Sequence, residues 1–186
     1  MQPMRRQDRQ IDLTEIKQIV KQCHVMHIAL NDAPFPYVVP TNYGYEWAGE
    51  TLILYSHGAP EGKKRQLIAA DPHVCVEIDG GATLLPAGTN APAYSAAYQS
   101  VIGYGTAELV NDPAVKRHAL DLLLQHETGQ ALATYDPVPE AVIQHVGVIK
   151  LTLPTLTGKA HHDPAAQAQQ AESSDAVSGA SRSEQD

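Results

Sequence analysis

Short runs of alternating hydrophobic and polar residues recur along the chain and predict β-strands. Such alternation buries one side of a strand and leaves the other side to solvent. Six segments have this character, at residues 23–30, 37–47, 51–57, 73–80, 97–110 and 146–154. Strands do not alternate regularly with helices, which disfavours a parallel α/β sheet. The pattern predicts a mainly β fold, a six-stranded antiparallel barrel with flanking helices.

Helical periodicity and end signals appear between these strands. Asp12 is placed to cap the first helix, and Asp112, followed by a proline, is placed to cap the longest one. Pro72 ends a helix that follows a loop, and Gly129 lies just beyond the end of the longest helix. The expected helices lie at 12–22, within 58–72, at 112–126 and, as a short turn, at 137–145, with a loop at 81–96.

Three residues within the strands suggest local irregularities. Pro40 marks a sheet edge or a bulge because proline cannot donate to the ladder. Gly103 and Gly105 permit a bend or a close backbone approach. The segment 157–160 is expected to pair with the last strand and to end the ordered part of the chain.

Composition divides the 186 residues into one domain and a tail. Residues 1–159 have the hydrophobic content of a single folded domain. Residues 160–186 are rich in Ala, Gln and Ser and contain one large aliphatic side chain, Val177, so we expect a disordered acidic tail. This tail has five acidic residues and one arginine, which is half of the net charge of −8.

The net charge and the apolar runs exclude several classes of function. An acidic chain is a poor ligand for nucleic acid or for an anionic membrane surface. No apolar run approaches the ~20 residues that a membrane span needs, and no secretory signal is recognisable. Two cysteines are too few for a disulfide scaffold, so a reducing, cytoplasmic location is expected.

A cluster of three basic residues is the most informative charge feature. Lys63, Lys64 and Arg65 follow Gly62 at the start of a predicted helix. Backbone N–H groups and the helix dipole favour an anion there, and the ammonium groups add positive charge. The surrounding residues do not form a Walker loop. The alternative is a solvated basic turn without a ligand.

His57 ends a strand just before this basic cluster. A neutral imidazole there can bind a metal, contact a substrate carboxylate or move a proton, whereas a single His is more often structural. Cys23, His24 and His27 resemble a metal cluster, but two side chains on one face of a strand do not make a zinc site. We therefore predict no metal site. The segment 98–105 is rich in glycine but does not open a helix, so it is no dinucleotide fingerprint.

Several blocks occur together in an order that resembles the pyridoxamine-phosphate-oxidase-like flavoproteins, in particular their nitroimidazole-resistance (Nim) branch. The most specific block is the EGKK sequence with its upstream histidine. The resemblance covers roughly residues 4–160. The blocks are CHVMHIAL (23–30), PYVVPTNYGY (36–45), LYSHGAPEGKK (54–64), VCVE (74–77), YQSV (98–101) and TGK (157–159).

The resemblance implies a split-barrel flavin-binding fold and a homodimer with FMN at the interface. FAD is an alternative cofactor, and heme bound through His57 is another. In the Nim branch the matching histidine faces the flavin, which makes His57 the candidate catalytic residue. The implied cofactor-binding residues are Val39, Pro40, Thr41 and Asn42 along the ring edge, Tyr55, Ser56 and His57 beside the ring, Lys63 and Lys64 at the phosphate, and Gln99 and Ser100, from the same or the partner subunit.

Two functions follow from this resemblance. The first is a flavin-dependent oxidoreductase that reduces small acceptors such as nitroaromatic compounds, with His57 positioning or protonating the acceptor. The second is a non-catalytic module that binds flavin or heme. The substrate-phosphate motif that ends true pyridoxamine-phosphate oxidases is not evident, which argues against that substrate.

Overall fold

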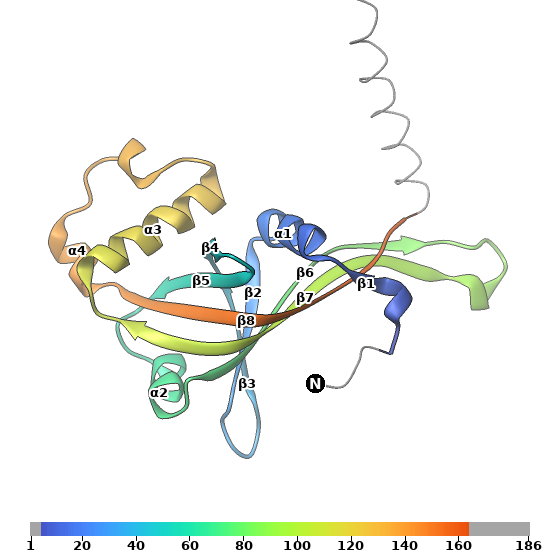
Figure 1. Cartoon of the computed structure of the whole chain (residues 1–186), viewed down its shortest axis with the longest axis horizontal. Helices are drawn as coiled ribbons and strands as arrows, with labels where there is room; N and C mark the ends of the chain where they lie inside the picture. Colours follow the sequence, from blue (N-terminus) through green and yellow to red (C-terminus); the bar gives the residue numbers. More distant parts are fainter. Residues whose placement is uncertain (1–4, 164–186) are drawn as a thin grey trace, which may run out of the picture.

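One antiparallel sheet of eight strands organises the computed structural model, which describes residues 5–163. Its order is β3-β2-β6-β7-β8-β5-β4, with β1 paired to β8, and the sheet curls into a split barrel (Figure 1). The mainly β prediction is confirmed, with eight strands instead of six. The strands are β1 (Gln10–Ile11), β2 (Val25–Leu30), β3 (Tyr37–Asn42), β4 (Gly44–Ala48), β5 (Thr51–Gly58), β6 (His73–Leu85), β7 (Ser95–Val110) and β8 (Gly147–His161).

One of the two extra strands is β1, which was not predicted, and the other arises because the segment predicted as one strand at 37–47 divides at Tyr43. Its ring is fully buried, and its hydroxyl donates to the carbonyls of Val20 at 2.8 Å and Cys23 at 2.7 Å. Gly44 then lies so close to the backbone of Leu123 that a Cβ there would be 2.4 Å from its nitrogen. The chain therefore leaves one edge of the sheet as β3 and enters the opposite edge as β4.

The helices begin and end close to the predicted positions. Asp12 accepts from the amide of Glu15, Asp112 accepts from Ala114, and Gly129 has the left-handed φ of 73° that ends the longest helix. No helix in the described residues is long and apolar enough to cross a membrane. The α-helices are α1 (Leu13–Gln22), α2 (Lys63–Ala70), α3 (Pro113–Thr128) and α4 (Glu140–His145), and the 3-10 helices are η1 (Gln7–Arg9), η2 (Ala91–Ala93) and η3 (Leu132–Thr134).

The core lies inside the curled sheet, between two helices. Alternate residues of β2 and β6 point inward, and Ile28 and Val76 are almost fully buried. In Figure 1, α1 lies above the crossing strands and α2 below them. Val20 of α1 and Ile68 of α2 belong to the same apolar cluster as these strand residues. A second, smaller cluster lies around Tyr55 and Ala119, where α3 packs on β5.

The predicted loop at 81–96 is confirmed only in its middle, at 86–94, and its two ends are strand. β6 continues to Leu85 and β7 begins at Ser95, and these two residues pair with each other. The hairpin extends from the body as an arm, shown in green at the right of Figure 1. Gly80 and Gly81 suggest a loop in the sequence, but the ladder passes them through a register shift between Gly80 and Thr83.

β8 is also longer than predicted, because 146–154 and 157–160 form one strand. Ala160 and His161, which the prediction placed in the tail, belong to this strand, and residues 164–186 lie outside the described residues. A register shift between Tyr104 and Thr106 bends β7 against β8, as the glycines suggested. A Cβ on Gly105 would lie 1.9 Å from the carbonyl oxygen of Thr152, so only glycine fits this approach.

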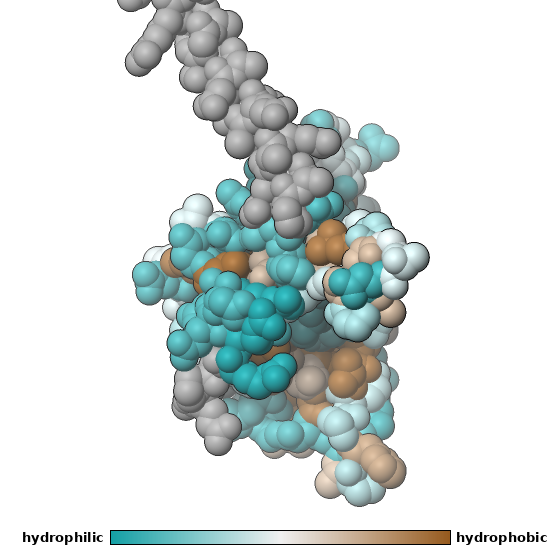
Figure 2. Space-filling view, turned by 90° about the vertical axis from the view of Figure 1, so that its right-hand side faces the viewer, coloured by the Kyte–Doolittle hydropathy of each residue, from teal (hydrophilic) through white to brown (hydrophobic). Residues whose placement is uncertain are grey.

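The outer face of four neighbouring strands bears apolar side chains. Register places Val38, Ala29, Cys75 and Tyr104 in one row across β3, β2, β6 and β7. Val38 is 54% exposed and Tyr104 is 42% exposed. Figure 2 shows that on the side of the molecule nearest the arm, hydrophobic residues reach the surface in patches between hydrophilic ones.

Candidate functional site

The basic cluster and His57 line a common cavity of about 220 Å³. The end of β5, the start of β8, β3 and the N-terminus of α2 meet there. Gly58 of β5 pairs with Gly147 of β8, and a Cβ on Gly147 would lie 2.3 Å from the carbonyl oxygen of Ala59. The lining residues are Tyr37, Val39, His57, Gly58, Ala59, Glu61, Gly62, Lys63, Lys64, Arg65, Gly147 and Ile149.

The N-terminus of α2 opens toward this cavity without a side-chain cap. Gly62 occupies the N-cap position with a φ of 137°, and no side chain accepts from the first-turn amides. These amides and the dipole of the helix provide partial positive charge. An anion in the cavity would therefore satisfy donors that this protein leaves without a side-chain partner.

Lys64 is the most enclosed cation of the cavity. Its ammonium group donates to the hydroxyl of Ser56 at 3.3 Å, and the Ser56 and Thr41 hydroxyl oxygens are 3.1 Å apart. Burial lowers the pKa of Lys64, and the positive charge of Arg65 lowers it further. Neither cation forms a salt bridge within residues 5–163. An anion here would interact with the positive charges of both Lys64 and Arg65 without displacing a carboxylate.

Lys63 and Arg65 are held in different ways at the same helix end. The Lys63 ammonium pairs with the carboxylate of Asp32 at 2.5 Å and lies 4.9 Å from the centre of the Tyr37 ring. Arg65 donates to the carbonyl of Val148 at 3.2 Å. Asp32 and Tyr37 flank the turn between β2 and β3, and the sequence analysis assigned them no role. Their proximity to the helix depends on the curl of the sheet, for which the sequence carries no signal.

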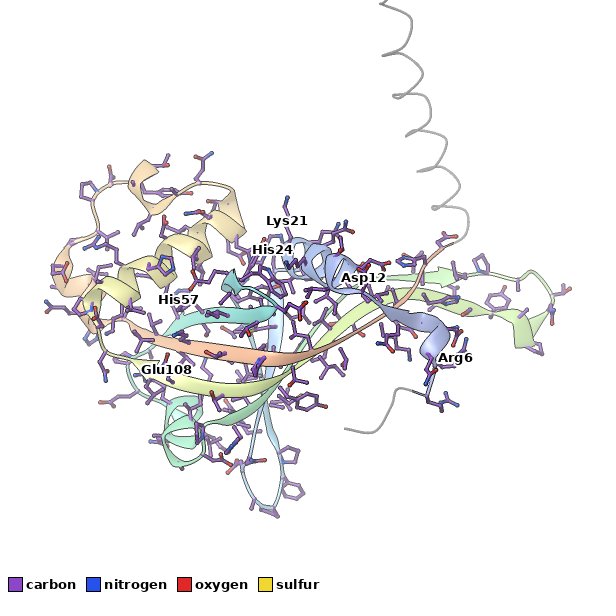
Figure 3. The ribbon with its side chains drawn as sticks, in the orientation of Figure 1. Arg6, Asp12, Lys21, His24, His57 and Glu108 are labelled. Atoms are coloured by element: carbon purple, nitrogen blue, oxygen red, sulfur yellow. The ribbon has the colours of Figure 1, made fainter. Side chains whose placement is uncertain are left out.

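His57 lies near the end of β5, in register with Val148 of β8 (Figure 3). Its side chain is exposed, whereas the preceding residue, Ser56, is only 1% exposed. Among the described residues, no hydrogen bond or salt bridge to the His57 ring is found. The imidazole is thus free to contact a molecule that enters the cavity.

The structure brings together most of the predicted cofactor-binding residues. Val39, His57, Lys63 and Lys64 line the cavity. Thr41 and Ser56 are linked to it through the hydrogen bond of Ser56 with Lys64.

The remaining predicted residues lie elsewhere. Pro40 and Asn42 are exposed and do not line the cavity, and Asn42 donates to Glu127 instead. Tyr55 is buried and does not line the cavity, and its hydroxyl donates to Glu46 at 2.8 Å. Gln99 and Ser100 on β7 do not line the cavity, and Gln99 donates to Gln22 at 3.4 Å.

The residues of the suspected metal cluster do not converge. His24 pairs with Glu127, and His27 pairs with Glu77 on the neighbouring strand. A Cβ on Gly80 would lie 2.9 Å from the Cys23 sulfur, so that thiol packs against β6. The predicted histidines thus belong to two separate groups, each completed by residues distant in sequence.

The family model for pyridoxamine 5'-phosphate oxidase matches residues 12–160, which is most of the described chain. This chain belongs to the pyridoxamine 5'-phosphate oxidase family. The match confirms the resemblance drawn from the EGKK and neighbouring blocks. A search of curated proteins found no match.

Solved structures of several organisms share the fold of this family member. A Bacteroides thetaiotaomicron protein assigned to 5-nitroimidazole antibiotic resistance is 30% identical, with a TM-score of 0.69 over 81% of this chain and 86% of that one. The flavocytochrome Anf3 of Azotobacter vinelandii is 22% identical, with a TM-score of 0.74 over 87% and 73%. The FAD and heme binding protein of Mycobacterium smegmatis is 17% identical, with a TM-score of 0.72 over 83% and 74%.

Proposed function

We propose that this chain is a flavin-binding oxidoreductase that reduces small acceptors such as nitroaromatic compounds. The observation that carries the proposal is the cavity in which Lys64, Arg65 and an uncapped helix N-terminus surround space for an anion, with His57 on its wall. A flavin phosphate carries close to two negative charges and matches these donors. The resistance protein similar to this chain supports the choice of nitro compounds as acceptors.

The size of the cavity supports a cofactor site completed by a second subunit. Pockets for cofactors and drug-sized ligands usually measure ~300–1,000 Å³. The cavity of one chain, at about 220 Å³, suits the phosphate end of a flavin nucleotide but is small for the whole molecule. We propose a homodimer in which Gln99 and Ser100 of one subunit approach the flavin held by the other, since neither lines its own cavity.

The protein would have three tasks in this reaction. Lys63 and Lys64 bind the phosphate of FMN, and the backbone of β3 near Val39 orients the ring edge. The bound flavin supplies electrons or hydride for the reduction. His57, exposed on the cavity wall, positions the acceptor and donates a proton to a nitro oxygen as electrons arrive.

The proposal is tested by the absorbance spectrum of the purified protein, before and after incubation with FMN or FAD. We expect flavin bands and co-elution of the flavin with the protein in gel filtration. Absence of these bands with both flavins would refute the proposal. In the next step, protein whose flavin has been reduced with dithionite is mixed anaerobically with a nitroimidazole. Reappearance of the oxidised flavin spectrum measures transfer to the acceptor.

A double substitution tests the phosphate assignment. Lys63→Ala with Lys64→Ala removes two charge-assisted contacts, each worth ~1.5–3 kcal/mol, so FMN affinity should fall at least ~100-fold. Lys17→Ala with Lys21→Ala is the matched control, because it makes the same charge change on α1. Fluorescence titration measures both affinities. Equal weakening in the two double variants would show a general charge effect and no phosphate site.

A heme-binding module without turnover is the second candidate, and the accessible imidazole of His57 favours it. The similar fold of a flavocytochrome and of a protein that binds FAD and heme supports testing it. A Soret band that disappears in His57→Ala, together with retained flavin binding, would assign heme to this residue. A flavin spectrum without a Soret band after incubation with hemin would exclude the heme module and favour the oxidoreductase.

A further inference from the structure

Two histidines and a glutamate converge at a place distant from the cavity in sequence and fold. His24 lies between α1 and β2, whereas His126 and Glu127 lie in the last turn of α3. One possible ligand atom from each side chain lies within 4.8 Å of those from the other two. Figure 3 labels His24 and Lys21 beside the end of α1 that approaches α3.

Hydrogen bonding fixes the orientation of the His126 ring. Its Nδ1 is 2.7 Å from the carbonyl oxygen of Tyr43, and a carbonyl can only accept, so Nδ1 carries the hydrogen. Nε2 is then a lone-pair acceptor in the neutral ring, yet it faces another acceptor, the carbonyl oxygen of Lys21, at 3.2 Å. Either a second proton on the ring or a metal ion bound at Nε2 would remove this repulsion.

The geometry of the other two side chains suits a shared metal ion. His24 Nδ1 is 3.6 Å from Glu127 Oε1, too far for a hydrogen bond but suitable for two ligands of one ion. The His24 and His126 ring centres are 4.9 Å apart. The two rings are stacked with their planes at 22°, so the exposed His24 ring would have to turn for both imidazoles to face one ion.

An outer hydrogen-bond shell supports these ligands. Asn42 donates to Glu127 Oε1 at 3.2 Å and to the backbone carbonyl of His24 at 3.1 Å. Together with the bond from His126 Nδ1 to Tyr43, this shell orients a carboxylate and an imidazole before any ion arrives. Such partners of the ligands are typical of metal sites in proteins.

We propose that His24, His126 and Glu127 bind a divalent transition-metal ion of the Zn²⁺ class. Two imidazoles and one carboxylate are a ligand set that zinc accepts, with a fourth position left for water. The His24 side chain is 49% exposed, so that position is open to solvent. The ion would join the segment that follows α1 to the end of α3, and it would contradict the expectation of no metal site.

The experiment uses tag-free full-length protein treated with a chelator and dialysed. Calorimetric titration with Zn²⁺ should give one ion per chain, and Co²⁺ should give the visible absorption of a tetrahedral site. His24→Ala and Glu127→Gln each remove a ligand and should weaken Zn²⁺ binding about tenfold or more. Both residues are at the surface end of their elements, and equal melting temperatures without metal would verify their folding.

His27→Ala is the matched control, because His27 with Glu77 and Asp79 forms the second group that the chain could offer to a metal. Unchanged zinc affinity in this control, with a loss in the other two variants, would support the proposal. Three results would overturn it: no zinc binding, equal binding by His24→Ala and the unaltered chain, or loss of binding only in His27→Ala. Because the readout is metal alone, the outcome does not depend on flavin binding.

Discussion

The exposed imidazole of His57 and the enclosed ammonium of Lys64 have different tasks within one cavity. Lys64 is surrounded by protein on several sides, and burial makes its charge costly unless an anion is present. His57 contacts no charged partner in the described chain and is accessible to a ligand. Binding and chemistry can therefore be separated by substitution.

A substitution of His57 should slow electron transfer and leave cofactor binding intact. His57→Ala removes the proposed proton donor, and general acid catalysis usually contributes ~10²–10⁴-fold. We expect reoxidation of the reduced flavin by a nitroimidazole to slow by about that factor, with FMN affinity changed less than about threefold. His73→Ala is the control, an exposed histidine at the start of β6. Equal rates for His57→Ala and the unaltered protein would exclude an acid role.

Two carboxylates have opposite effects on the pH dependence of stability. Burial raises the pKa of Glu77, and the charge of Asp79 raises it further, although His27 opposes this. The side chain of Asn31, with the backbone and ring of His73, lowers the pKa of Asp71 to about 2. A carboxyl group whose pKa is raised by folding, such as Glu77, favours the folded state below its ordinary pKa of 4.5 and loses this contribution as the pH rises. A carboxyl group whose pKa is lowered, such as Asp71, favours the folded state above its ordinary pKa of 3.8 and loses this contribution as the pH falls.

Replacing Glu77 and Asp71 by their neutral amides should change the melting temperature in opposite directions. At neutral pH, Glu77→Gln should melt at a higher temperature than the unaltered protein, and this gain should vanish below pH 4.5. Asp71→Asn should melt at a lower temperature at neutral pH, and the deficit should close as the pH falls from 3.8 toward 2. Melting curves across pH measure both. Differences that stay constant with pH would contradict the assignment.

At the scale of elements, the close approach of β7 and β8 determines the bend of the barrel. The register shift near Gly105 puts its backbone against the carbonyl of Thr152. The atoms nearest to a Cβ at this position are backbone atoms of Thr152 and Leu153, and backbone cannot move aside as a flexible side chain can. Because β7 and β8 pair along most of their residues, a bend between them changes the direction of a large part of the sheet.

An added methyl group at this approach should destabilise the sheet. Gly105→Ala would place a Cβ 1.9 Å from the Thr152 carbonyl oxygen, and such overpacking typically costs ~1–3 kcal/mol. Gly58→Ala is the matched control, since no atom lies within 4 Å of its Cβ. Urea unfolding should show a lower free energy of unfolding for the first variant and little change for the second. Similar free energies of unfolding for the two variants would show that the close approach at Gly105 does not constrain the sheet.

At the scale of the whole molecule, the apolar row on β3, β2, β6 and β7 is the surface that we propose for the second subunit. Val38 and Tyr104 lie at its two ends and are both well exposed. β3 contributes Val38 to this face and Val39 to the cavity. Because β3 is the edge strand of the sheet, a partner on this face would lie beside the strand whose other side lines the cavity.

Charge on this face should separate the subunits and weaken flavin binding together. Val38→Lys with Tyr104→Lys would bury two unpaired charges in the proposed interface. Sedimentation should show a dimer for the unaltered protein and a monomer for this variant, with FMN affinity lowered at least ~tenfold. Val142→Lys with Tyr135→Lys is the control, at exposed apolar residues near α4. Full FMN affinity in a monomer would refute the shared site.

Local sequence patterns were enough to predict the class of fold and the basic end of the site. Alternation, caps and glycines act within a few residues, so the strands, α1, α3 and the Gly62-Lys63-Lys64 helix start were predictable. The family blocks added the assignment to pyridoxamine 5'-phosphate oxidase relatives.

The contacts between residues distant in sequence became visible only in the folded chain. The loop predicted at 81–96 became an arm because pairing between β6 and β7 satisfied backbone groups that local glycines left undecided. Tyr55 is absent from the cavity wall because its ring packs in the apolar cluster beneath α3 and its hydroxyl donates to Glu46. His24 met His126 because the curled sheet places the end of α1 against the end of α3. Such contacts depend on the register and curvature of the whole sheet, which no short segment encodes.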